Sequence, residues 1–168
     1  MSQADFVYEL LKACHNRGID TAIETCGYAD WQDLEKVCRY ANSVFFDIKH
    51  ADPHKHKELT GVDNKLILDN LEKLSRSFRE TPIVVRTPIV PGLTDSKENI
   101  EAIASFLAKI KNLKAYELLP YHRFGESKYR QLGKQFSLDA CQPPAKEHLE
   151  KLEKAVQKRS LNCISTAS

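Results

Sequence analysis

The order of helix-like and strand-like segments is the feature that most restricts how this chain can fold. Strand-like apolar runs occupy residues 21–25, 43–49, 82–90 and 114–119. Amphipathic helical patterns lie before, between and after them, so the predicted order is α-β-α-β-α-β-α-β-loop-α. Strands that alternate with helices form parallel sheets through right-handed crossovers. The sequence therefore predicts an α/β fold of roughly four parallel strands, either a doubly wound sheet or an incomplete (β/α) barrel.

Length and local punctuation predict a single domain over residues 1–168. The 168 residues match one ordinary domain, and 42% of them are apolar, enough for a sizeable core. Within it we expect a core over residues 1–122, an irregular loop over 120–143 and a C-terminal helix over 144–158. Asp95 and Glu98 form a capping-box pattern, which predicts the start of the helix before the fourth strand.

Charge and apolar-run length exclude two classes of protein. The formal net charge is only +2, and no long run of one sign occurs, which disfavours a nucleic-acid-binding or membrane-surface protein. No apolar stretch approaches the roughly 20 residues of a membrane-spanning helix. The first residues have neither the basic start nor the apolar centre of a signal peptide. We therefore expect a cytoplasmic protein with no membrane or nucleic-acid partner.

Cysteine spacing gives no sign of a metal clip or a redox pair. The number of cysteines is odd and no Cys-x-x-Cys pair exists, so reduced, structural thiols are expected. The five positions are Cys14, Cys26, Cys38, Cys141 and Cys163.

Polar residues gather where the predicted strands end, which is where parallel α/β sheets bind ligands. Asp47 and Lys49 are two apart and share a strand face, so together they can grip a zwitterion. Arg86 interrupts an apolar run and needs an anionic partner if buried. Such groups suit a ligand with an amino group, a carboxylate and a ring. The candidate residues are Glu24, Thr25, Asp47, Lys49, Arg86, Pro88 and His122.

Each candidate also has a purely structural interpretation, and two other chemistries stay open. Asp47 and Lys49 can form a structural ion pair, and Thr25 can cap a turn. Three histidines at 50, 54 and 56 suggest a metal, but a fourth ligand is lacking. A Schiff base on Lys49 would need a desolvated amine, whereas Asp47 nearby favours the charged form.

At these residues the sequence resembles the radical S-adenosylmethionine (SAM) enzymes that activate glycyl radical enzymes, and pyruvate formate-lyase activating enzyme most of all. The spacing matches almost throughout, from the first helix to the last. The segments that carry the resemblance are residues 24–27 (ETCG), 44–49 (VFFDIK), 60–62 (TGV), 85–95 (VRTPIVPGLTD) and 117–122 (ELLPYH), followed by Gly125, Lys128 and Leu132-Gly133.

The resemblance implies a partial (β/α) barrel that holds a [4Fe-4S] cluster and SAM. Reductive cleavage of SAM then gives a radical that removes hydrogen from a glycine of the partner, a glycyl radical enzyme. By matching position, Asp47 and Lys49 would hold the amino acid end of SAM. Thr25 would help there, and it would also border a monovalent cation site that Glu24 and the Phe45 carbonyl share. The remaining expectations are that Arg86, Pro88 and His122 lie along the ribose and adenine, and that the loop from Tyr121 to Gly133 faces the partner.

The family's cluster motif, Cys-x3-Cys-x2-Cys, does not occur in this sequence, so no iron–sulfur ligand and no catalytic residue is assigned to it. The chain is expected to be the C-terminal part of an activating enzyme, to bind neither cofactor tightly and to be inactive alone. Missing βα units would expose a strand edge and an apolar helix face, which predicts self-association. The alternatives are a cluster-free module that binds SAM or a nucleoside, and a barrel aldolase that uses Lys49.

Overall fold

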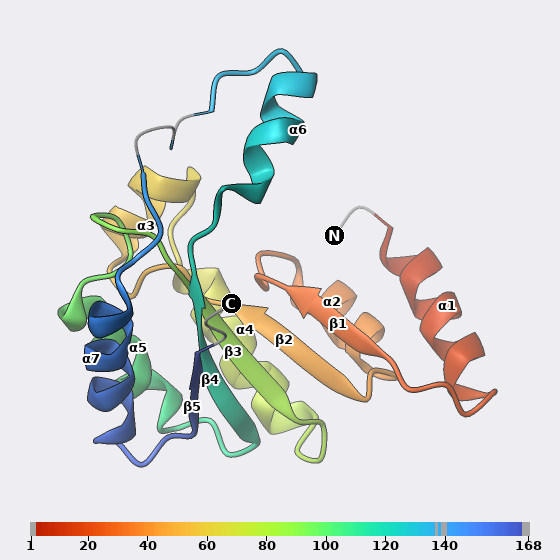
Figure 1. Cartoon of the computed structure of the whole chain (residues 1–168). Helices are drawn as coiled ribbons and strands as arrows, with labels where there is room; N and C mark the ends of the chain where they lie inside the picture. Colours follow the sequence, from red (N-terminus) through yellow and green to blue (C-terminus); the bar gives the residue numbers. More distant parts are fainter. Residues whose placement is uncertain (1–2, 137, 139–140, 166–168) are drawn as a thin grey trace.

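The computed structural model describes residues 3–136, 138 and 141–165, and its centre is a five-stranded parallel sheet (Figure 1). The strands follow one another in sequence order, from β1 at one edge to β5 at the other, and the sheet does not close into a barrel. The predicted α/β class with a partial parallel barrel is confirmed. The strands are β1 (Ala22–Thr25), β2 (Ser43–Asp47), β3 (Ile83–Ile89), β4 (Leu113–Pro120) and β5 (Cys163–Ser165).

Helices fill the connections and cover one face of the sheet. In Figure 1 α2 and α4 lie behind the strands, α5 and α7 stand side by side to the left of β4 and β5, and α3 and α6 lie beyond the carboxyl ends of the strands. α1 packs against α2 at the β1 edge. The helices are α1 (Ala4–His15), α2 (Trp31–Cys38), α3 (Pro53–Thr60), α4 (Lys65–Ser77), α5 (Lys97–Leu107), α6 (Glu126–Gln131) and α7 (Lys146–Gln157), with a short 3-10 helix η1 (Arg123–Gly125) before α6.

Side-chain alternation along the strands separates an apolar face from a polar one. On β3, Val85, Thr87 and Ile89 are buried, whereas Val84, Arg86 and Pro88 between them are only half-buried. β2 shows the same alternation and pairs with β3 in register. Since successive strand residues point to opposite faces, the core lies on one side and the candidate polar groups of β2 and β3 on the other.

The fifth strand is a correction to the predicted number. β5 is only three residues long and follows the last helix, where the sequence shows no periodic pattern. The strand is positioned by tertiary contacts: the Tyr116 amide donates to the Asn162 carbonyl at 2.8 Å, and Asn162 Nδ2 donates to the Lys114 carbonyl at 3.1 Å. A run this short is recognised only through the strand it pairs with.

Two local predictions are also wrong. The region 120–142, expected to be irregular, contains η1 and α6. The N-cap of α5 is Ser96, whose Oγ accepts from the Asn99 amide at 3.2 Å. Asp95, the predicted cap, instead accepts from the Gly92 amide at 2.8 Å and closes the turn that follows β3.

The β1 side of the molecule ends in an unpaired strand edge and an apolar helix surface. β1 pairs with β2 on one side, and the residues described here supply no strand for its other side. On α1 the side chains of Phe6 and Leu10 are 63% and 50% exposed. Among the described residues, no helix has the length and apolar character needed to cross a membrane.

Candidate functional site

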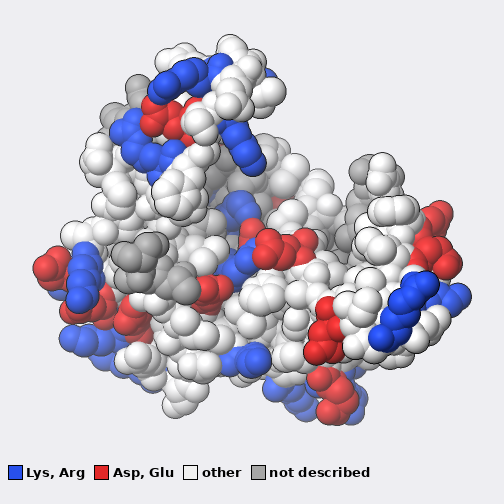
Figure 2. Space-filling view, turned by 45° about the vertical axis from the view of Figure 1, so that its right-hand side comes forward, with Lys and Arg blue, Asp and Glu red and all other residues white. Residues whose placement is uncertain are grey.

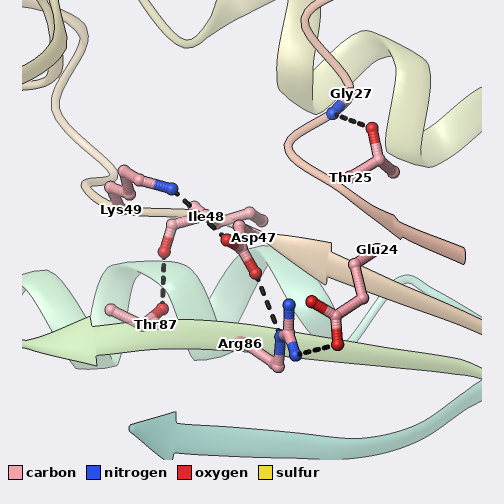
Figure 3. Close-up of polar contacts among 8 residues, drawn as sticks. All are labelled: Glu24, Thr25, Gly27, Asp47, Ile48, Lys49, Arg86 and Thr87. Atoms are coloured by element: carbon pink, nitrogen blue, oxygen red, sulfur yellow. Dashed lines mark hydrogen bonds and ion pairs between the residues drawn. The ribbon is translucent and has the colours of Figure 1, made fainter. Parts of the chain in front are cut away.

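Three charged side chains form the centre of the site, where β2 and β3 lie side by side (Figure 3). Asp47 and Arg86 are register partners on the two strands. Arg86 Nε donates to Asp47 Oδ1 at 3.0 Å, and Lys49 Nζ donates to Asp47 Oδ2 at 3.4 Å. Both oxygens of the Asp47 carboxylate are therefore bound by cations. Asp47 and Lys49 therefore share one face, as their spacing predicts, and Arg86 has the anionic partner that its burial requires.

Arg86 extends this cluster across β2 to the edge strand. Its Nη1 donates to Glu24 Oε1 on β1 at 3.0 Å, and its guanidinium lies 5.2 Å from the centre of the Phe45 ring. Burial opposes the charged form of Arg86, but the hydrogen bond with Glu24 and the charge of Asp47 outweigh it, so the pKa of Arg86 lies above its ordinary value. The same hydrogen bond lowers the pKa of Glu24. Arg86 thus neutralises two carboxylates on the open face of the sheet.

A cavity of about 290 Å³ opens beside this cluster, at the carboxyl ends of β1 and β2. We call it the β1–β2 cavity. Asp47 and Lys49 lie in its wall, so a ligand in the cavity meets one anionic and one cationic group. The remaining lining residues come from the loop after β1, from α3, from the segment that joins α3 to α4 and from α4, and they are Cys26, Tyr28, His56, Thr60, Val62 and Ile67.

Thr25 and Glu24 bond to different partners within the chain. They are neighbours in a strand, so their side chains point to opposite faces. The Thr25 hydroxyl accepts a hydrogen bond from the Gly27 amide at 3.0 Å, and Glu24 is paired with Arg86 (Figure 3). Pro88 lies on the same face as Arg86, two residues further along β3, and pairs with Leu119. Through its bond to the Gly27 amide, Thr25 caps the turn that follows β1.

His122 lies apart from the other candidates. Its exposed ring stacks on Phe124 with centroids 4.2 Å apart, and its Nδ1 accepts weakly from the Phe124 amide at 3.4 Å. It lines a separate cavity of about 370 Å³ between the end of β4 and the start of α7. The sequence places His122 at a strand end, but the chain turns outward there and takes it away from Asp47 and Lys49.

Buried asparagines that the sequence analysis did not single out fasten the loops around the site. Asn70 on α4 is fully buried, and its Nδ2 donates to the Gly27 and Ala29 carbonyls at 2.8 Å each. Asn70 stands within the apolar stripe of its helix, and a polar residue in such a stripe is the sequence sign of a buried hydrogen-bonding role. The loop that carries Cys26 and Tyr28 is therefore bonded to the core through the side chain of Asn70.

Two further asparagines hold the loops after β2 and β3. Asn64 Nδ2 donates to the His50 and Ala51 carbonyls at 2.8 and 2.7 Å. Asn99 joins the two loops, since its Oδ1 accepts from the Ala51 amide and its Nδ2 donates to the Thr94 carbonyl, both at 2.8 Å. Such bonds satisfy loop backbone groups that would otherwise be buried without partners.

Comparison with known proteins identifies the family. Residues 1–107, more than half of the chain, match the model of the radical SAM superfamily. The chain belongs to the radical SAM superfamily. A 4-hydroxyphenylacetate decarboxylase activating enzyme from Clostridioides difficile is 42% identical over 96% of this chain and 51% of its own length. An isethionate sulfite-lyase activating enzyme from Oleidesulfovibrio alaskensis is 44% identical over 80% of this chain and 43% of its own.

A solved structure of similar extent supports the same assignment. The crystal structure of a domain of pyruvate-formate lyase-activating enzyme from Bacteroides vulgatus superposes with a TM-score of 0.80 and 25% identity. The superposition covers 98% of this chain and 91% of the Bacteroides vulgatus domain. The chain spans about half the length of the curated radical SAM relatives it matches. The family and the partial-barrel fold predicted from the sequence are thereby confirmed.

The two cofactors of full-length radical SAM proteins fit this chain unequally. SAM carries an ammonium and a carboxylate at its amino acid end, and the β1–β2 cavity offers Asp47 and Lys49 to these two groups. The cluster does not fit the described residues, among which no group of three His, Cys, Asp or Glu can hold a metal ion. Cys38, for example, is buried, and burial raises the pKa of its thiol to about 12.

The histidine-rich segment after β2 also gives no metal site among the described residues. His50 Nδ1 accepts from the Asp52 amide at 3.0 Å, and His56 Nδ1 lies 2.7 Å from the Val62 carbonyl. These ring nitrogens are occupied by the chain's own backbone. The two histidines therefore shape the turn into α3 and the loop that follows that helix.

Proposed function

We propose that this radical SAM chain supplies part of the SAM site of a glycyl-radical-enzyme activating enzyme, and that the β1–β2 cavity receives the amino acid end of SAM. The observation that carries the proposal is the pair Asp47 and Lys49, opposite charges 3.4 Å apart in the wall of one cavity. A cavity at the carboxyl ends of parallel strands is where such folds bind ligands.

In this proposal the chain's residues bind and orient the cofactor. Asp47 accepts from the ammonium group and Lys49 pairs with the carboxylate. Arg86 holds the Asp47 carboxylate in place through its Nε, while its Nη1 bonds to Glu24 across the sheet. The cofactors, when bound, supply the radical chemistry of the family. Thr25, Glu24, Pro88 and His122 keep the cofactor-side roles that the resemblance implies as part of the proposal.

A ligand titration followed by NMR tests the cavity. The ¹⁵N-labelled chain is titrated with SAM, and we expect saturable amide shifts at residues 26–28, 47–49 and 56–62, with weak affinity because only part of the site is present. Asp47→Asn and Lys49→Met should each weaken binding about tenfold, the loss expected for one hydrogen bond to a charged group. Lys57→Met, on the exposed surface of α3, is the matched control. No shifts around the cavity at millimolar SAM would overturn the proposal.

We also propose that the chain alone does not cleave SAM, since its sequence lacks the cluster motif. Under anaerobic reducing conditions the chain should release no 5′-deoxyadenosine, and measurable release would contradict this. The second candidate is a cluster-free SAM or nucleoside module, favoured by the intact Asp47–Lys49 geometry. Tight binding of adenosine alone in the same titration would support that module.

The partner is proposed to be a glycyl radical enzyme, of the pyruvate formate-lyase type or a relative, and to dock on the projecting arm. We define the arm as residues 121–133, which include η1 and α6 within the loop 120–143. Phe124 and Leu132 are 79% and 69% exposed there. Figure 2 shows Lys and Arg side chains crowding the arm at the top of the view. Replacing Phe124 by Ser should weaken capture of the partner without changing the chain's melting temperature.

Two predictions about organisation also stay proposals. The chain is proposed to act as one domain, with a core over 1–122 and a C-terminal helix over 144–158 that contains α7. Self-association is proposed through the free β1 edge and the exposed Phe6 and Leu10 of α1. Sedimentation equilibrium should give a mass above that of the 19.2 kDa monomer, and Leu10→Lys should return it to the monomer. A monomeric wild-type chain would contradict the proposal.

A further inference from the structure

His56 is a buried histidine that nevertheless lines the β1–β2 cavity. It lies on α3 and is only 2% exposed, yet it stands in the same wall as Asp47 and Lys49. Besides His56 and the two charged residues, the lining residues that carry a polar side-chain atom are Cys26, Tyr28 and Thr60. Only His56 of the whole set combines nearly complete burial with a ring nitrogen.

The orientation and tautomer of this ring are fixed by the chain. Nδ1 lies 2.7 Å from the Val62 carbonyl, which can only accept, so Nδ1 carries the proton. Thr60 Oγ1 lies 3.1 Å from the same nitrogen while it donates to the His56 carbonyl at 2.8 Å. In the neutral ring with a proton on Nδ1, Nε2 is a hydrogen-bond acceptor.

The helix that carries His56 is itself held at both ends. Asp52 caps its start, with Oδ1 accepting from the His54 and Lys55 amides at 2.8 and 3.0 Å. Gly61 ends it in the left-handed region, at a φ of 87°. The ring therefore has little freedom to turn away. Because Nδ1 is directed at the Val62 carbonyl, Nε2 is the ring nitrogen left for a ligand.

The cavity is short of acceptors for a ligand ammonium group. Each oxygen of Asp47 already accepts one hydrogen bond, Oδ1 from Arg86 and Oδ2 from Lys49, so the carboxylate has about two of its four lone-pair sites left. An ammonium group has three donors and loses free energy for each one that is buried without an acceptor. A neutral Nε2 in the same wall offers a further acceptor without adding charge beside Lys49.

We propose that His56 is a ligand-positioning residue, whose Nε2 accepts a hydrogen bond from the ammonium group of the amino acid end bound by Asp47 and Lys49. This inference rests on the proposed function. The competing explanation is that His56 only closes the end of α3 through Val62, in which case a ligand would leave Nε2 unaffected.

Two amide substitutions separate these explanations, because each reproduces one nitrogen of the ring. His56→Asn places its amide near Nδ1, so it keeps the bond to Val62 and loses the acceptor at Nε2. His56→Gln places its amide near Nε2 and loses the bond to Val62. We expect His56→Asn to melt near the wild-type temperature and to bind S-adenosylhomocysteine about tenfold more weakly, as for loss of a hydrogen bond to a charged group. His56→Gln should melt lower and retain more of the affinity.

The ligand supplies a matched control. The analogue of S-adenosylhomocysteine that has hydrogen in place of the amino group should bind wild type and His56→Asn equally. In the wild-type chain, two-bond ¹H–¹⁵N spectra should show the His56 Nε2 resonance moving with S-adenosylhomocysteine and staying still with the deaminated analogue.

The outcomes identify which proposal fails. If wild type binds, Asp47→Asn weakens binding, and His56→Asn binds as wild type with an unmoved Nε2 resonance, the role of His56 is overturned and the proposed function stands. If the wild-type cavity shows no binding of S-adenosylhomocysteine, both are overturned. A tenfold loss that is the same for both ligands would also overturn the assignment to the ammonium group.

Discussion

The carboxyl ends of β1–β3 and the projecting arm lie at the same end of the molecule, but they are held in different ways. The loops after β1, β2 and β3 are fastened to the core by Asn64, Asn70 and Asn99, each no more than 3% exposed. η1 and α6 of the arm contain no buried residue. In Figure 1 the arm stands away from the sheet, whereas the loops lie directly over it.

The difference shows that the loops around the cavity have a fixed geometry and that the arm does not. Loops whose backbone groups bond to buried side chains open only with the core, so Asp47, Lys49 and His56 stay in one arrangement. The arm depends on its own short-range contacts, such as the Glu126–Arg130 ion pair at 3.0 Å. Exposed ion pairs of this kind contribute little, so the arm can open without unfolding the sheet.

The largest expected effect comes from a methyl group at Gly27 in the first of these loops. Gly27 has a φ of 69°, and an added Cβ would lie 2.2 Å from the buried ring of Phe46. Gly27→Ala combines left-handed strain with overpacking and should lower the free energy of unfolding by about 4 kcal/mol. Urea denaturation of the variant measures this loss.

Gly133 at the end of the arm is the matched control. Its φ of 63° is similar, but an added Cβ meets nothing within 4 Å. Gly133→Ala should therefore destabilise the chain only through backbone strain, by about 1 kcal/mol. This strain should affect the arm and not the core. Equal losses at the two glycines would contradict the contrast between the regions.

A smaller effect is expected from removing an asparagine that fastens a loop. Asn70→Ala leaves the Gly27 and Ala29 carbonyls without their donor, and also removes a buried Oδ1 that has no partner among the described residues. The net loss should be about 2 kcal/mol, measured by urea denaturation, with faster amide exchange at 26–30. Asn162→Ala, which loses one exposed bond to Lys114, should cost well under 1 kcal/mol. A result in which Asn162→Ala is the more harmful would be incompatible with this account.

The smallest effect should follow loss of charge in the arm. Glu126 pairs with Arg130 at 3.0 Å and with Arg123 at 3.1 Å. Glu126→Gln should leave the urea midpoint unchanged within about 0.5 kcal/mol and speed hydrogen exchange only at residues 123–131. If global stability dropped by more than that, the arm would be coupled to the core, and the two regions would not differ as described.

The helices and the first four strands could be predicted because their patterns are long. Apolar residues recur with a helical period in α1, α4 and α5, and β2 and β3 are strands of five and seven residues that are mostly apolar. β5 and α6 could not be predicted in this way. β5 has three residues and α6 has six, too few for a period to stand out, and β5 in addition depends on its pairing with β4.

The candidate site was predicted unevenly for a similar reason. Asp47 and Lys49 are close in sequence and share a strand face, so their pairing follows from local geometry. The bond from Arg86 to Glu24 crosses β2 and depends on the strand order. His122 is two residues past the end of β4, but the outward path of the arm sets its position.

The sequence by itself determined the α/β class, the family and the charged residues at the strand ends, because periodicity, motif spacing and side-chain alternation are local properties of the chain. Only the tertiary structure decided that Arg86 joins two carboxylates, that buried asparagines hold three loops, and that His56 shares a cavity with Asp47 and Lys49. These contacts join residues 5 to 62 positions apart, and no local pattern encodes which of them meet once the sheet has formed.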